Sequence, residues 1–93
     1  MSKKEDFYLK LQESLDNTTS FPSEYLYKFI VPTNANQVIE VEEIFKEELI
    51  KMVVNESKTG KYMSISIHVT LSSSFEVISY YQRAETIEGI ISL

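Results

Sequence analysis

The sequence predicts an α+β fold of two layers, and three observations support this. Residues 62–71 alternate between apolar and polar side chains, which is typical of a strand with one buried face. The stretches around 38–49 and 77–87 instead repeat apolar residues at helical spacing. A glycine-containing turn at 58–61 separates two strand-like runs. The resulting order β-α-β-β-α-β, after a short N-terminal helix, predicts a ferredoxin-like sandwich with a four-stranded antiparallel sheet.

The first 20 residues are expected to form a helix and a connector. Ser2 and Glu5 have the spacing of a capping box, and the apolar residues that follow favour a helix over 3–16. Polar residues 16–20 then end it. We expect residues 21–93 to form a single domain, which begins with a strand over 24–31 closed by Pro32.

The next segment is predicted to be an amphipathic helix. Asn34 and Gln37 are a possible cap at its start. Its apolar stripe lies opposite a row of glutamates and comprises Val38, Val41, Ile44, Phe45 and Leu49.

A hairpin and a third helix complete the predicted domain. Residues 50–57 and 62–71 form the two arms of the hairpin around Lys58–Lys61. Ser73 and Glu76 are the third and best capping box, and Gly89 is expected to end the helix behind them. Residues 90–93 read as a last short strand, and the strand at 50–56 is expected at an exposed edge.

Two helices can cover only one face of such a sheet, so the other face is expected to be open. The predicted inward-facing residues are Tyr25, Tyr27, Phe29, Val31, Met63, Ile65, Ile67, Val69 and Leu71. The predicted open-face residues are Leu26, Lys28, Ile30, Tyr62, Ser64, Ser66, His68 and Thr70. Four tyrosines, Tyr25, Tyr27, Tyr80 and Tyr81, are expected in the core and at its rim.

Composition and charge exclude several classes of function. The chain has no cysteine, which excludes disulfides, thiolate chemistry and cysteine-based metal sites. Its net charge of −5 disfavours nucleic acid and anionic membranes as partners. Lys3 and Lys4 are followed by further charges and not by an apolar signal core, so we expect a cytoplasmic protein.

No pattern predicts catalysis, a metal site or a cofactor. His68 is the single histidine and has no evident metal-binding or catalytic partner. Thr59-Gly60-Lys61 lacks the earlier glycine and the following helix of a phosphate-binding loop. Serines stand where an RNA-recognition motif would place stacking aromatic residues on the strand after Tyr62. We therefore expect a protein that is not an enzyme.

Three stretches resemble a known family: FPSEYLYKFIVP, SKTGKYMSISIHVT and EGIISL. They are similar to segments of the YbeD-like proteins, a bacterial family of unassigned function, most specifically at Ser57, Gly60, Tyr62 and Ser64 and at Tyr27-Lys28. The resemblance implies a ferredoxin-like fold similar to ACT domains, which are regulatory modules that bind small ligands, often amino acids, and commonly form pairs. ACT ligand sites typically use a glycine in the loop after the first strand, and residues 32–36 contain none.

Two hypotheses for function follow. The first is an ACT-like regulatory module that binds a small polar metabolite on the open face or at a homodimer seam. Lys28 would supply charge, and Ser64, Ser66 and His68 would supply hydrogen bonds. The second is an adaptor that binds another protein through the same face, or through the hairpin with Lys58, Lys61 and Tyr62 against an acidic partner.

Overall fold

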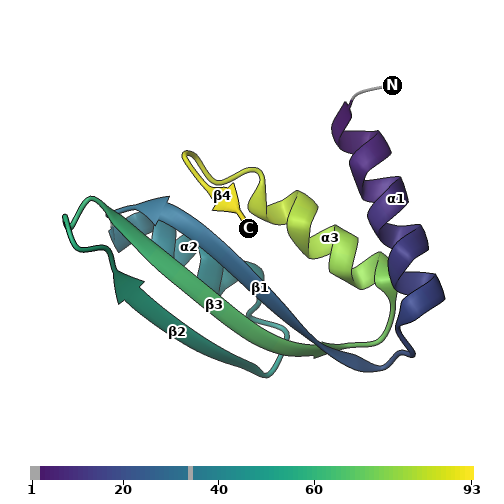
Figure 1. The fold of residues 1–93 in the computed structure, drawn as a ribbon. Coiled ribbons are helices and arrows are strands. Elements are labelled where there is room, and N and C mark those ends of the chain that lie inside the picture. Colours follow the sequence, from purple (N-terminus) through teal and green to yellow (C-terminus); the bar gives the residue numbers. More distant parts are fainter. Residues whose placement is uncertain (1–2, 34) are drawn as a thin grey trace.

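The computed structural model describes residues 3–33 and 35–93, and it confirms the predicted ferredoxin-like arrangement (Figure 1). The expected order of elements is present, with one helix before the β-α-β-β-α-β unit. The helices are α1 (Lys3–Thr18), α2 (Ala35–Ile44) and α3 (Ser74–Ala84); the strands are β1 (Ser23–Pro32), β2 (Ile50–Glu56), β3 (Tyr62–Leu71) and β4 (Ile91–Ser92). The proposed caps at Ser2 and Asn34 lie outside the described residues.

The four strands form one antiparallel sheet in the order β2-β3-β1-β4. Strand β2 lies at an edge, as predicted. The register pairs Tyr27 of β1 with Ile67 of β3, so the buried residues of both strands fall on the same face. In Figure 1, α2 lies behind the sheet, and the opposite face carries no helix.

The β2–β3 hairpin is closed by Ser57 and Gly60. The Ser57 amide donates to the carbonyl of Tyr62 at 2.8 Å, and the Tyr62 amide donates to Ser57 Oγ at 3.1 Å. Gly60 has a backbone φ of +74°, a conformation that residues with a Cβ atom rarely adopt. This turn fixes the register in which Glu56 faces Met63.

The prediction that Leu49 belongs to the buried stripe of the second helix is wrong. Helix α2 ends at Ile44, and the chain then tightens into i→i−3 hydrogen bonds, from the Phe45 amide to the Glu42 carbonyl at 3.2 Å and from Glu48 to Phe45 at 3.0 Å. Phe45 is still fully buried, but Leu49 is 97% exposed because the turn has rotated it toward solvent.

Helix α3 begins as predicted and ends earlier than predicted. Ser73 Oγ accepts from the Glu76 amide at 3.2 Å, while the Glu76 carboxylate accepts from the amide of Ser72 at 2.7 Å. The helix ends at Ala84 and not at Gly89, because the amides of Thr86 and Ile87 bond three residues back, to Arg83 and Ala84. Gly89, at φ +77, belongs to the turn before β4, where a Cβ would lie 3.1 Å from Pro32 Cγ.

Helix α1 runs antiparallel to α3 on the outer side of the domain. Ser74 Oγ donates to Asp16 Oδ1 at 2.5 Å near one end, and the Tyr8 hydroxyl donates to the Glu85 carboxylate near the other. Leu15 packs against the core, but no residue of α1 is buried. A few contacts along one side therefore hold this helix.

An aromatic cluster centred on Tyr27 joins the sheet to its helices. The Tyr27 side chain is fully buried, and its hydroxyl donates to the carbonyl of Val77 in α3 at 2.9 Å. Its ring centroid lies 5.2 Å from that of Phe45 and 4.9 Å from that of Tyr81. The Tyr25 and Tyr81 hydroxyls are 2.8 Å apart, which adds a second link between β1 and α3.

Truncating Tyr27 should be the most damaging change to the core. Tyr27→Ala should lower the free energy of unfolding by about 3–5 kcal/mol, because it leaves a cavity among aromatic rings. Tyr27→Phe keeps the ring and loses one hydrogen bond, which should cost about 1 kcal/mol. Urea unfolding measures both; Tyr62→Phe, at a half-exposed ring, is the matched control. Equal, small effects of all three changes would contradict the central role of Tyr27.

Burial also affects how the protein responds to alkaline pH. Desolvation, assisted by the hydrogen bond to Glu48, raises the pKa of Tyr80 from 10.0 to about 12. Desolvation likewise raises the pKa of Tyr8, Tyr27 and Tyr81 above the usual range. The folded state therefore retains protons that the unfolded chain loses above about pH 10.

Stability should be unaffected by these groups below about pH 10 and should fall as the pH rises through the folded pKa values. For the buried Tyr27, the slope approaches about 1.4 kcal/mol per pH unit. Urea unfolding at a series of alkaline pH values measures this fall, and Tyr80→Phe should make it shallower. A free energy of unfolding that stayed constant well above pH 10 would contradict the prediction.

Candidate functional site

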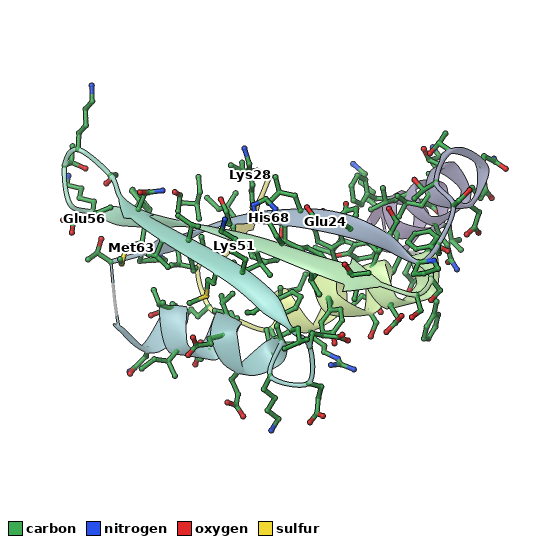
Figure 2. All side chains as sticks on the ribbon, turned by 90° about the horizontal axis from the view of Figure 1, so that it is seen from below. Glu24, Lys28, Lys51, Glu56, Met63 and His68 are labelled. Atoms are coloured by element: carbon green, nitrogen blue, oxygen red, sulfur yellow. The ribbon has the colours of Figure 1, made fainter. Side chains whose placement is uncertain are left out.

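The face of the sheet away from the helices carries the residues that the alternation predicted. Figure 2 shows Lys28 and His68 on the side opposite α2 and α3. Lys28 pairs with Ser66, and His68 lies between Leu26 of β1 and Lys51 of β2. Neighbouring strands thus bring cations, hydroxyls and an imidazole together on one surface.

The predicted open-face site residues are placed as follows. Lys28, Ser66 and His68 occupy adjacent positions in the central two strands, and Ser64 lies one step further along β3, beside Ile30. Ser66 and His68 are half-buried, whereas Lys28 and Ser64 are exposed.

The predicted hairpin residues lie at the other end of the sheet from His68. Lys58, Lys61 and Tyr62 are all exposed, and Tyr62 begins β3. His68 lies six positions after Tyr62 along the strand, which corresponds to roughly 20 Å. The two groups of predicted site residues therefore form two separate surfaces.

A hollow of about 520 Å³ lies at the His68 end of the open face. Its polar lining combines a carboxylate, an ammonium group, an imidazole and a hydroxyl from three strands. Its apolar lining comes from residues at the start of β2 and on β3. The lining residues are Glu24, Leu49, Ile50, Lys51, His68, Val69 and Thr70.

The polar groups of this hollow are held close together. His68 Nδ1 lies 3.4 Å from Glu24 Oε1, and the side chains are 38% and 69% exposed respectively. Lys51 is the cross-strand neighbour of His68, so opposite charges flank the imidazole. Such an arrangement can accept hydrogen bonds on one side of a ligand and donate them on the other.

Sequence reasoning missed Glu24 and Lys51 as members of this site. Lys51 could have been found, because the hairpin turn sets the pairing of 56 with 63 and therefore that of 51 with 68. Glu24 had no comparable signal, since a helix and another strand separate β1 from β3 and no short turn fixes their register.

Two further classes of site are absent from the residues described. No helix over 3–33 and 35–93 is both long and apolar enough to cross a membrane. Within the same ranges, no three acidic or histidine side chains gather where they could hold a metal ion.

Comparisons with known proteins concern the domain and its fold. The model of a family described as "Protein of unknown function (DUF493)" matches residues 16–93. No match was found among the curated proteins. The solution structure of protein HP0495 from H. pylori, a structural genomics target, is similar with a TM-score of 0.66 and 21% identity, over 82% of this chain and 86% of that one. At this identity, the similarity shows the fold alone.

Proposed function

We propose a function for this chain, which belongs to the DUF493 family of proteins of unknown function. In this proposal, it is a non-enzymatic regulatory module that binds a small zwitterionic ligand. Membership confirms the resemblance to the YbeD-like proteins. The proposal is supported chiefly by the hollow at Glu24, Lys51 and His68, where a carboxylate and an ammonium group face one cavity.

The chemistry of the hollow favours a zwitterion such as an amino acid. A ligand ammonium group would bind the Glu24 carboxylate, and a ligand carboxylate would bind Lys51. The Thr70 hydroxyl and the imidazole supply further hydrogen bonds, and the exposed Leu49 side chain supplies apolar contact. A purely anionic ligand would be repelled by Glu24, and a purely cationic one by Lys51.

This site does not use the loop after β1, the usual ACT ligand loop, which lacks glycine. The hollow lies on the open face, between the beginning of β1 and that of β2. Since its charged groups are largely exposed, we expect a dissociation constant on the order of 1 mM.

Ligand binding should appear as thermal stabilisation. Each common amino acid, added at about ten times a Kd of about 1 mM, should contribute about 1.4 kcal/mol if it binds. That corresponds to a rise in Tm of roughly 5–10 °C for a domain of this size. Glu24→Gln and Lys51→Gln should each abolish the rise caused by the active compound. Glu13→Gln and Lys10→Gln, two exposed changes on α1, are the matched controls.

If no amino acid raises the Tm, the ligand class is wrong. If one does so equally well in the Glu24 and Lys51 variants, the hollow is not its site.

A second candidate, a protein-binding adaptor, is favoured by the exposed apolar side chains of the same face. Leu26 is 41% exposed and Val53 40%, and at the hairpin Tyr62 is 48% exposed and is preceded by the exposed Lys58 and Lys61. An acidic partner with an apolar centre would be complementary to this surface. Native mass spectrometry of protein purified from its host separates the candidates: a small extra mass supports the ligand, whereas an attached polypeptide supports the adaptor.

A further inference from the structure

A second cavity lies on the other side of the molecule, between α1, α3 and the end of the chain at β4. Its volume is about 420 Å³. Part of its lining is made by Lys3, Lys4, Phe7 and Tyr8 of α1, which precede the family match at residues 16–93. Figure 1 shows α1 rising from the domain beside α3, and β4 beyond the far end of α3. The cavity therefore depends on an element outside the matched domain.

The lining of this cavity is mainly aromatic and apolar, and it also includes two lysines, a glutamate and a serine. Phe7 and Tyr8 of α1 and Tyr81 of α3 line it, and the ring centroids of Tyr8 and Tyr81 lie 6.4 Å apart. Ile90 and Leu93, at the end of the chain, add further apolar lining. Phe7 is 61% exposed and Leu93 69% exposed, so this apolar surface is not covered within the chain.

The polar groups that line the cavity differ in whether they already have hydrogen-bond partners. The Glu85 carboxylate accepts a hydrogen bond from the Tyr8 hydroxyl, and the Tyr81 hydroxyl is paired with that of Tyr25. These groups therefore already have partners. The ammonium groups of Lys3 and Lys4, by contrast, come from exposed residues that line the same cavity.

We propose that this cavity is a second ligand site, which binds a small aromatic anion. The ring of the ligand would pack between Phe7, Tyr81 and Leu93, and its anionic group would face Lys3 and Lys4. Two lysines outnumber the one lining carboxylate, that of Glu85, which is already hydrogen-bonded to Tyr8, so the cavity is complementary to a flat organic molecule that carries a carboxylate or sulfonate. This inference is independent of the zwitterion site, because the two cavities share no residue.

The aromatic sulfonate 8-anilinonaphthalene-1-sulfonate is a suitable probe, because its fluorescence rises in apolar surroundings. The folded protein should bind it at one site. Phe7→Ala should weaken binding about fivefold by removing one aromatic wall. The double change Lys3→Gln and Lys4→Gln should weaken it about two- to fivefold at low salt, with a smaller effect at high salt. Because all three side chains are exposed, these variants should fold normally, which circular dichroism checks.

The controls separate this cavity from other surfaces. Leu9 lines a different hollow between α1 and α3, so Leu9→Ala should leave binding unchanged, as should Lys10→Gln. Glu24→Gln should also leave it unchanged, whatever that variant does to amino-acid binding. Loss of binding in Leu9→Ala with full binding in Phe7→Ala would overturn the proposal. So would the absence of saturable binding by the folded protein.

Discussion

The burial of aromatic rings around Tyr27 is the constraint on which the rest of this small domain depends. Its two covering helices, α2 and α3, have only 10 and 11 residues, so large side chains must supply much of the buried surface. The Tyr27 hydroxyl bonds to α3, and its ring packs on Phe45 just beyond α2. Both helices therefore pack on the same face of the sheet, and no helix among the described residues covers the other face (Figure 2).

The candidate binding site is a consequence of that division. Because side chains alternate along each strand, burying Tyr27 and Ile67 places Leu26 and His68 on the open face. The antiparallel register then brings Lys51 beside His68, and Glu24 within 3.4 Å of its ring. Opposite charges meet there without burial, and the proposed recognition of a polar small molecule rests on that arrangement.

The sequence predicted the faces of the strands better than it predicted the ends of the helices. The period-two pattern of residues 62–71 and the cap at Ser73 rest on local physics, and both are confirmed. Leu49 and Gly89 were misplaced because turns with i→i−3 hydrogen bonds end α2 and α3 early, and no proline or glycine marks those ends. The hollow was only partly foreseen, since the partnership of Glu24 with His68 depends on a long-range register.

The central claim is that the hollow at Glu24, Lys51 and His68 binds a small zwitterion. The most direct test is a ¹H–¹⁵N NMR titration of the intact protein with a mixture of the common amino acids. The account predicts saturable shifts concentrated on the strand ends that carry these three residues. The absence of shifts, or shifts confined to the hairpin or to the second cavity between α1, α3 and β4, would contradict it.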